Sequence, residues 1–355
     1  MRRWEEAIRC VTPYEPGEQP KGEDLVKLNT NENPYPPSPA VIARLEELKG
    51  GILRKYPDPA SAELVKALGE RYGLGEDRIF VGVGSDDVLA LSFLTFFNSQ
   101  RPVLFPDITY SFYKVWAELF GVPYVTLALD GEFGIRPEDY QRENGGVIFP
   151  NPNAPTGLYM PLDEVERIAA GNQDSVVIVD EAYVDFAGPS AAALLGKYEN
   201  LLVVQTFSKS RSLAGLRVGF AMGSPRLIKA LNDVKYSFNS YTMNLPAQIL
   251  GAASLGDEAY FQETVERIKE TRERAKERFR GLGFSFPDSQ ANFLFVTHPR
   301  VEAKELFEAL KRERIYVRYF HAPRLDNYLR VTIGTDGEME KLFEFLERYL
   351  EQYSG

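Results

Sequence analysis

Three charged residues lie at spacings that would suit an aldehyde cofactor. Lys209 comes 29 residues after Asp180 and 8 residues before Arg217. A lysine amine can form a Schiff base with an aldehyde, and a carboxylate such as Asp180 can keep a pyridine nitrogen protonated, so that the ring accepts electrons. The phenol of Tyr183 can hydrogen-bond the ring oxygen O3′, while Ser208 and Arg217 can bind a phosphate group. These chemistries, in this order, predict a pyridoxal phosphate site; the alternative is two strand ends with unrelated surface charge.

A glycine-containing turn supplies a second candidate contact for a phosphate. The run Gly82-Val83-Gly84-Ser85-Asp86-Asp87 follows an expected strand and opens an expected helix. A dinucleotide fingerprint would need a third glycine where Asp87 stands, so that interpretation is weak. The backbone amides of Gly84, Ser85 and Asp86 can still hold an anion at a helix N-terminus. The alternative is a plain glycine turn in which Ser85 caps the helix.

Two other positions lie at strand ends where a flat cofactor could bind. Tyr110 follows an expected strand, and an aromatic ring there can stack on a planar ligand; the alternative is one more packed tyrosine among nineteen. Asn153 lies in the turn Asn151-Pro152-Asn153-Ala154-Pro155-Thr156-Gly157, whose prolines and glycine restrict the backbone. Such a turn can aim a side chain at a ligand, or it can be purely structural.

Arg330 lies between apolar residues in an expected strand, Leu329-Arg330-Val331. A buried arginine needs an anionic partner, because an unpaired charge is costly away from water. A substrate carboxylate would bind its guanidinium group through two parallel hydrogen bonds. The alternative is an internal ion pair with one of the 51 acidic residues. Arg318 is a similar candidate for a second anion.

Composition limits the class of protein. The chain has 355 residues, 44% of them hydrophobic, and a formal net charge of −10. We expect a folded, globular protein with no nucleic-acid partner and no membrane span, since the charge is acidic and no apolar run is long enough. The two histidines are too few for a histidine-based metal cluster, so no metal site is predicted. The single cysteine, Cys10, is consistent with a cytoplasmic location.

Short apolar runs alternate with helical patterns through the first two thirds of the chain. This alternation predicts an α/β fold with a mostly parallel, helix-covered sheet, in which ligands bind at the carboxyl ends of strands. The expected strands are 79–81, 103–105, 122–129, 147–149, 176–179, 201–204 and 218–222, all expected to be buried. Helices are expected at 86–97, 111–120 and 162–170.

The pattern changes after about residue 257, where a smaller α+β domain is predicted. A long charged helix, 257–280, could bridge the two domains. It is followed by expected strands at 293–296, 315–317 and 329–333 and helices at 301–312 and 336–349. Residues 11–39 are rich in proline, glycine and asparagine and predict an extended arm outside any core. The predicted domains are an arm at 1–39, a large cofactor-binding domain at 40–256 and a small domain at 257–355.

The ordered motifs resemble the aspartate-aminotransferase superfamily, the fold-type I pyridoxal-phosphate enzymes, over almost the whole chain. Within it the chain resembles the histidinol-phosphate aminotransferases. The motifs that carry the resemblance are Thr12-Pro13-Tyr14, Leu28-Asn29-Thr30-Asn31-Glu32-Asn33-Pro34, Arg54-Lys55-Tyr56-Pro57, Asp180-Glu181-Ala182-Tyr183, Thr206-Phe207-Ser208-Lys209-Ser210, Leu213-Ala214-Gly215-Leu216-Arg217-Val218-Gly219 and Leu329-Arg330-Val331-Thr332-Ile333-Gly334.

The resemblance implies a role for each matching residue. Lys209 would bind the cofactor covalently, Asp180 would pair with the pyridine nitrogen and Tyr183 with O3′, as the three catalytic residues. The phosphate would be bound by Ser208, Arg217 and the backbone amides of Ser85 and Asp86. Tyr56 would reach the cofactor of the neighbouring subunit in a homodimer. The implied substrate-binding residues are Tyr14, Asn31, Arg318 and Arg330.

The chain departs from the family pattern at one position. Relatives commonly have asparagine immediately before the Pro-Thr-Gly turn, where it contacts O3′, but here that residue is Ala154. Either Asn153 takes over the contact or Tyr183 makes it alone.

The resemblance implies transamination of histidinol phosphate with 2-oxoglutarate, giving imidazole acetol phosphate and glutamate, in histidine biosynthesis. Two alternatives use the same cofactor contacts: an aromatic amino acid aminotransferase and a threonine-phosphate decarboxylase. A non-catalytic regulator would need an added and normally basic DNA-binding domain. The roughly forty residues before the large domain are acidic and proline-rich, so this possibility is remote.

Overall fold

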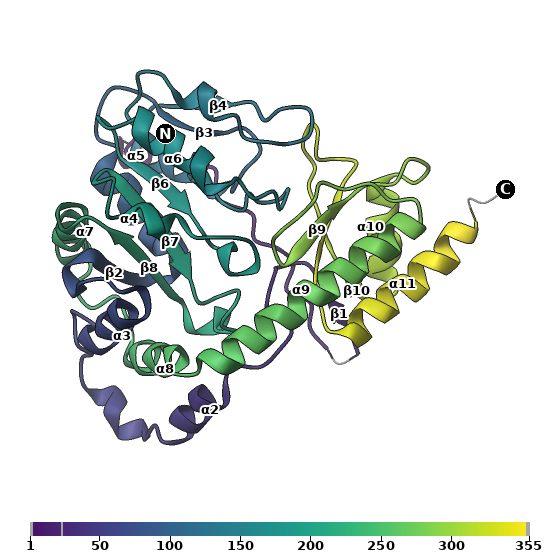
Figure 1. Cartoon of the computed structure of the whole chain (residues 1–355), viewed down its shortest axis with the longest axis horizontal. Helices are drawn as coiled ribbons and strands as arrows, with labels where there is room; N and C mark the ends of the chain where they lie inside the picture. The colour runs from purple at the N-terminus through teal and green to yellow at the C-terminus, as the bar shows by residue number, and fades with distance from the viewer. Residues whose placement is uncertain (1–2, 23, 353–355) are drawn as a thin grey trace.

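The computed structural model describes residues 3–22 and 24–352 and has a large and a small layered unit side by side (Figure 1). The large unit is built on a seven-stranded sheet, as the alternating pattern predicts. Its strands lie in the order β2 (Ile79–Val83), β8 (Val218–Gly223), β7 (Leu201–Thr206), β6 (Val177–Asp180), β5 (Gly146–Pro150), β3 (Val103–Pro106) and β4 (Tyr124–Leu127).

Helices cover both faces of this sheet because successive strand residues point to opposite sides. Val177 and Val179 pack in the core of one face, and Ile178 packs in the core of the other. The face of Ile178 is covered by α4 (Gly84–Phe96), α5 (Phe112–Phe120) and α7 (Pro225–Phe238). The opposite face is covered by α2 (Pro39–Glu46), α3 (Ala62–Tyr72), α6 (Leu162–Gly171) and α8 (Leu245–Leu255). The α/β class and the mostly parallel sheet are confirmed.

One antiparallel strand brings distant motifs to the same edge of the sheet. Strand β8 runs antiparallel to both β2 and β7, while the remaining neighbours are parallel. Arg217 immediately precedes β8, so it lies at the edge where β2 and β7 end. Asp180 ends β6, and Lys209 follows β7. The edge therefore collects side chains from β6, β7 and β8, as expected of ligand sites in such sheets.

The small unit contains two short sheets and three helices. Antiparallel strands lie in the order β11 (Arg318–Tyr319), β12 (Leu329–Thr332) and β9 (Phe293–Val296). The helices are α9 (Glu258–Gly281), α10 (Ala303–Arg312) and α11 (Asp336–Glu351). Thr335 and Glu338 form a reciprocal capping box that fixes the start of α11.

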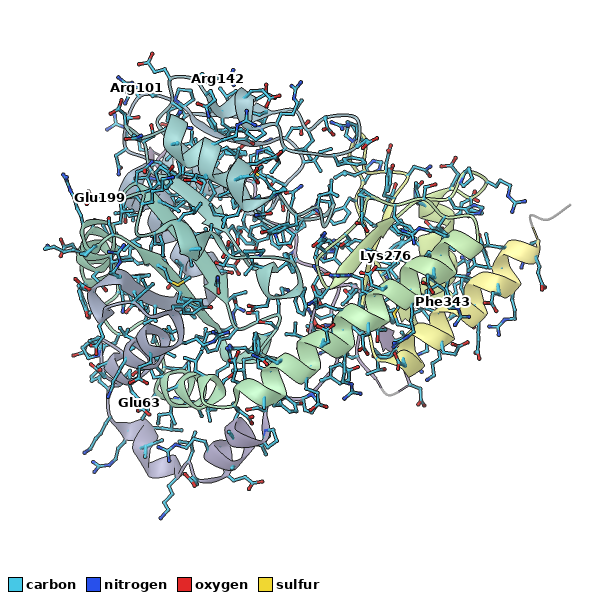
Figure 2. The ribbon with its side chains drawn as sticks, in the orientation of Figure 1. Glu63, Arg101, Arg142, Glu199, Lys276 and Phe343 are labelled. Carbon is cyan, nitrogen blue, oxygen red and sulfur yellow. The ribbon has the colours of Figure 1, made fainter. Side chains whose placement is uncertain are left out.

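Helix α9 bridges the two units, as its length and charge predict (Figure 1). At its start, Glu258 forms an ion pair with Arg71 of α3, 2.9 Å from atom to atom. Near its end, Phe279 packs edge-on against Phe343 of α11 with ring centroids 4.9 Å apart. Figure 2 labels Phe343 beside the C-terminal half of α9. The division at residue 257 stays a prediction.

The prediction that residues 11–39 lie outside any core is wrong for part of that segment. Strand β1 (Val26–Lys27) pairs in parallel with β10 (Ile315–Tyr316) of the small unit. Val26 and Leu28 are buried in the same core as α9, α10 and α11. Because only two residues of the segment pair, the proline- and glycine-rich sequence shows no recognisable strand pattern. Residues 26–28 instead form part of the small unit.

Two smaller predictions also need correction. The stretch expected as one strand at 315–317 is divided into β10 and β11, which join different sheets. Strand β4 is the edge strand of the large sheet, and Val125 is 37% exposed, so the predicted burial fails there. The remaining short elements are α1 (Arg3–Glu6) and six 3-10 turns: Gly50–Arg54, Glu76–Arg78, Pro137–Tyr140, Val184–Phe186, Ala191–Leu194 and Ala214–Leu216. In the part of the chain that the structure describes, no helix combines the length and apolar character needed to cross a bilayer.

Candidate active site

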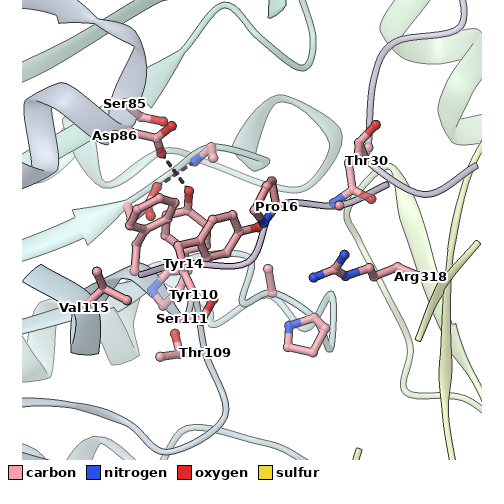
Figure 3. A pocket seen from close by; sticks show the side chains of 18 of the residues that line it. Tyr14, Pro16, Thr30, Ser85, Asp86, Thr109, Tyr110, Ser111, Val115 and Arg318 are labelled. Atoms are coloured by element: carbon pink, nitrogen blue, oxygen red, sulfur yellow. Dashed lines mark hydrogen bonds between the residues drawn. The ribbon is translucent and has the colours of Figure 1, made fainter. Parts of the chain in front are cut away.

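A cavity of about 640 Å³ lies at the edge of the large sheet, facing the small unit. Such a volume suits a cofactor-sized ligand. Figure 3 shows Ser85 and Asp86 on one side of this cavity and Thr30 and Arg318 on the other. Twelve of the predicted site residues line it: Tyr14, Asn31, Ser85, Asp86, Tyr110, Asp180, Tyr183, Ser208, Lys209, Arg217, Arg318 and Arg330. The cavity is thus built from the large sheet, the small unit and the N-terminal segment.

The Lys209 amine is buried in an environment that favours its neutral form. Its Nζ donates to the carbonyl oxygen of Thr30 at 3.0 Å and lies 5.7 Å from the centre of the Tyr183 ring. Burial, together with the nearby charge of Arg330, lowers the pKa of Lys209 to about 8. A lysine with this pKa supplies free amine near neutral pH, as a nucleophile for a carbonyl must.

Asp180 is a buried acid at the end of β6. Its Oδ2 accepts a 2.7 Å hydrogen bond from the hydroxyl of Tyr113, and its Oδ1 accepts from the backbone N–H of Ala182 at 3.3 Å. Burial raises the pKa of Asp180 to about 6, against the opposing effect of these bonds. A cation next to this carboxylate would relieve the cost of burying its charge. A protonated pyridine nitrogen is such a cation.

The turn at the start of α4 is the candidate anion site predicted from the sequence. Gly84 has a φ of +80°, and a Cβ built there would lie 2.3 Å from a guanidinium nitrogen of Arg217, so the position requires glycine. Arg217 donates to Ser208 Oγ at 3.3 Å and forms a 3.2 Å ion pair with Asp86. The hydroxyl of Tyr110 donates to the other Asp86 oxygen at 2.7 Å. The amides at the start of α4 and the side chains of Ser208 and Arg217 therefore converge on one anion site.

Tyr183 is linked to the N-terminal segment. Its hydroxyl oxygen accepts a 2.9 Å hydrogen bond from Nδ2 of Asn31. Its ring packs edge-on against Phe293 of β9, with centroids 5.1 Å apart. Burial raises the pKa of Tyr183, while Arg330 and the bond from Asn31 oppose that rise. The phenol therefore stays protonated and can donate to a ligand oxygen.

Arg318 and Arg330 are direct partners in the antiparallel pairing of β11 with β12. Each guanidinium group lies 5.5 Å from the centre of the Phe320 ring. Arg330 donates to the carbonyl oxygen of Asn29 at 3.0 Å, while its buried Nε has no hydrogen-bond partner. No ion pair between described residues includes either arginine. The internal ion pair considered for Arg330 is therefore absent from the described part, and two cations face the cavity together.

Three predicted residues lie outside the cavity lining. Gly84 lies behind its neighbours Ser85 and Asp86. Asn153 is buried, and its amide donates to the carbonyl of Ile108 and to Thr156 Oγ1, both at 3.1 Å. Its Oδ1 has no hydrogen-bond partner. We therefore leave Asn153 out of the proposed site.

Tyr56 is 82% exposed, and its ring packs against the ring of Tyr241 with centroids 4.7 Å apart. It does not line this cavity. Its exposure leaves it available to another subunit, which stays a prediction.

Sequence reasoning missed three contributors to the site. Tyr113 holds Asp180, and its position three residues after Tyr110 on α5 was the one available signal. Phe112 stacks on Tyr14 with centroids 4.2 Å apart and lines the cavity. The carbonyl of Thr30 contacts Lys209, which no side-chain motif could reveal. Among residues 3–22 and 24–352, no group of three or more acidic, histidine or cysteine side chains is placed to hold a metal ion.

Comparison with known proteins identifies the class of enzyme. The family model for class I and II aminotransferases matches residues 23–346, and the chain belongs to this family. It is 51% identical to a histidinol-phosphate aminotransferase of Lactococcus lactis subsp. lactis over 349 residues, which are 98% of this chain and 97% of the relative. It is 52% identical to histidinol-phosphate aminotransferase 1 of Methylococcus capsulatus over 343 residues, 97% of this chain and 96% of the relative. These relatives place it in the histidinol-phosphate aminotransferase branch.

Solved structures share the fold. The histidinol-phosphate aminotransferase of Sinorhizobium meliloti, in complex with pyridoxal-5′-phosphate, aligns with a TM-score of 0.84 at 24% identity, over 92% of this chain and 91% of that one. The L-threonine-O-3-phosphate decarboxylase of Porphyromonas gingivalis aligns with a TM-score of 0.79 at 20% identity, over 92% and 100%. The similarity at these identities concerns the fold alone.

The cofactor of this aminotransferase is pyridoxal phosphate. The donor set fits it. An amine of lowered pKa, a buried acid and a cup of amides with Ser208 and Arg217 line one cavity.

Proposed function

We propose that the protein transfers the amino group of histidinol phosphate to 2-oxoglutarate in histidine biosynthesis, giving imidazole acetol phosphate and glutamate. The observation that carries the proposal is the cavity itself, which is lined by a lysine amine and by two arginines that form no ion pair with any described acidic residue. The relatives at about half-identical sequence support the choice of substrate.

The catalytic residues have separate tasks. Bound pyridoxal phosphate supplies an aldehyde that takes up the amino group and a ring that accepts electrons from Cα. Lys209 would take a proton from Cα and return it, because burial lowers the pKa of its amine and so favours the neutral, basic form. Asp180 would keep the ring nitrogen charged, and the hydroxyl of Tyr113 holds the Asp180 carboxylate in place.

The paired arginines suit two anionic substrates that share one pocket. Glutamate and 2-oxoglutarate carry an α-carboxylate, which Arg330 can bind bidentately. Histidinol phosphate carries instead a phosphate, which extends further from Cα. Arg318 and Arg330 are directly paired across strands β11 and β12. We therefore propose that both bind this phosphate, with Tyr14 beside them. Asn31 lines the same wall.

An aromatic wall supports a flat donor ring. Tyr14 stacks on Phe112, and Phe112 stacks on Trp116 with centroids 5.0 Å apart. Such a wall accepts an imidazole ring or a phenyl ring through the same dispersion contacts. It therefore also favours the aromatic amino acid aminotransferase alternative, at least as a side activity.

We propose a homodimer as the functional unit and a cytoplasmic location. Tyr56 is 82% exposed and packs against the ring of Tyr241, and Leu53, three residues earlier in the chain, is 66% exposed. Exposed aromatic and aliphatic groups of this kind favour an interface. Tyr56 would complete the phosphate cup of the partner. The proposed substrates are small polar metabolites, which suits an enzyme of the cytoplasm.

The test supplies the purified protein, loaded with pyridoxal phosphate, with histidinol phosphate and 2-oxoglutarate and follows glutamate. Parallel reactions contain phenylalanine, tyrosine or threonine phosphate as donor. Glutamate formation fastest with histidinol phosphate is the expected result. Faster turnover of the aromatic amino acids would reassign the enzyme, and release of carbon dioxide from threonine phosphate would identify a decarboxylase.

A further inference from the structure

The Tyr183 hydroxyl has a fixed hydrogen-bond direction. Asn31 Nδ2 donates to its oxygen at 2.9 Å, and among the described hydrogen bonds this hydroxyl donates to no protein acceptor. A phenol that accepts a bond with a lone pair must direct its own proton elsewhere. Tyr183 lines the cavity, so that proton is left for a ligand oxygen.

Asn31 itself is held by the small unit. Its backbone N–H donates to Thr332 Oγ1 at 3.0 Å, and the Thr332 hydroxyl donates to Asn31 Oδ1 at 3.1 Å. Asn292 Nδ2 donates to the Asn31 carbonyl at 3.0 Å. Because Oδ1 is occupied by Thr332, Nδ2 is the side of the amide that faces Tyr183. All three residues are buried.

The backbone at Asn31 favours this residue type. Its φ is +57°, in the left-handed region that asparagine, aspartate and glycine tolerate best. The carbonyl oxygen of the preceding residue, Thr30, accepts a hydrogen bond from the Lys209 amine at 3.0 Å. Two consecutive residues of the N-terminal segment therefore contact two of the three catalytic side chains.

Among the described hydrogen bonds, no other side-chain amide donates to the Tyr183 hydroxyl. Position 154 is alanine, with only a methyl group in the same apolar cluster as Tyr183. The Asn153 amide is engaged with Ile108 and Thr156 instead. The amide that acts on the phenol thus comes from a different part of the chain.

We propose that Asn31 is a positioning residue for Tyr183, which directs the phenol proton towards O3′ of the cofactor and supplies the amide that position 154 lacks. The proposal rests on the cofactor site described above but not on the identity of the amino donor. It gives Asn31 a task on the cofactor beyond the substrate contact predicted from the sequence.

The test is a double-variant cycle read from the cofactor's absorbance without any substrate. Asn31→Gly removes the amide and tolerates the left-handed backbone. A weaker hydrogen bond from Tyr183 would leave more negative charge on O3′. That charge would raise the pKa of the nearby nitrogen through which Lys209 binds the cofactor. The pH midpoint of the visible absorbance change should therefore rise by about half a pH unit in Asn31→Gly and by about one in Tyr183→Phe. Cofactor affinity should fall about fivefold in Asn31→Gly.

The decisive measurement is the combined variant. In the Tyr183→Phe background, Asn31→Gly should leave the midpoint unchanged, since no hydroxyl remains to be positioned. An equal shift with and without the Tyr183 hydroxyl would overturn the proposal, as would no shift in Asn31→Gly alone. The matched control is Asn33→Ala, which removes a hydrogen bond from the same segment to the Ser210 carbonyl and should not move the midpoint.

A second variant keeps the test usable if Asn31→Gly folds poorly. Thr332→Val removes the hydroxyl that orients the Asn31 amide and should shift the midpoint in the same direction. An unchanged midpoint in a folded Thr332→Val protein would also count against the proposal. Failure of histidinol phosphate as a donor would disprove the proposed function and leave these absorbance results untouched.

Discussion

Replacing Lys209 with methionine should stabilise the cofactor-free protein while removing its activity. Burial lowers the pKa of this lysine from 10.5 to about 8. A shift of that size corresponds to about 3 kcal/mol against the charged amine. Methionine has a similar length and no charge, but it loses the hydrogen bond to the Thr30 carbonyl, which contributes about 1 kcal/mol. The net gain in free energy of unfolding at pH 7 is therefore about 2 kcal/mol.

The pH dependence gives this prediction its sign. Between pH 8 and pH 10.5 the unfolded chain holds the lysine proton and the folded chain does not, so the wild type gains stability as pH rises through that window. The methionine variant lacks the group. Its advantage should therefore shrink by about 2 kcal/mol between pH 7 and pH 10.

The assay is guanidinium denaturation of both cofactor-free proteins at the two pH values. Lys66→Met, on the surface of α3, is the control and should change stability by less than about 0.5 kcal/mol. A methionine variant less stable than the wild type at pH 7, or an advantage independent of pH, would refute the reasoning about Lys209.

Three other predictions follow from the site. Arg318→Ala should reduce kcat/KM for histidinol phosphate about tenfold or more and change that for glutamate less, whereas Arg330→Ala should reduce both; the reverse order in donor profiling would contradict the paired phosphate site. Asp180→Asn should reduce kcat about 100-fold or more without preventing folding, measured in single-turnover experiments, and near-normal turnover would exclude the acid from its role. Mixing Lys209→Ala with Tyr56→Ala subunits should restore about a quarter of wild-type activity, because half of randomly paired dimers are mixed and each has one complete site; no recovery would place Tyr56 in its own subunit's site.

The parts of the fold and site that the sequence could predict are those encoded locally. Strand ends followed by Asp180, by Lys209 and by the Gly84 turn predicted the cavity, because each motif lies within a few residues of its strand. Parallel or nearly parallel strands then bring their ends to one edge. The mostly parallel sheet and the bridging helix were predicted for the same reason.

What could not be predicted depends on pairs far apart in the chain. Asn31 contacts Tyr183 across 152 residues and Thr332 across 301, and no local pattern specifies such pairs. Strand β1 has two paired residues, too few for a period to appear. Tyr113 reaches Asp180 only because α5 covers the face of the sheet on which Asp180 lies.

The pairing of Val26 with Ile315 has a consequence for biosynthesis. The ribosome delivers the first of these residues long before the second, so the N-terminal strand has no partner while the large sheet is being completed. Cotranslational folding of the large sheet can precede this step, but the segment that touches Lys209 and Tyr183 can settle only after the last helices emerge. A nascent chain stalled before residue 315 should therefore hold a folded sheet beside an unfinished catalytic pocket.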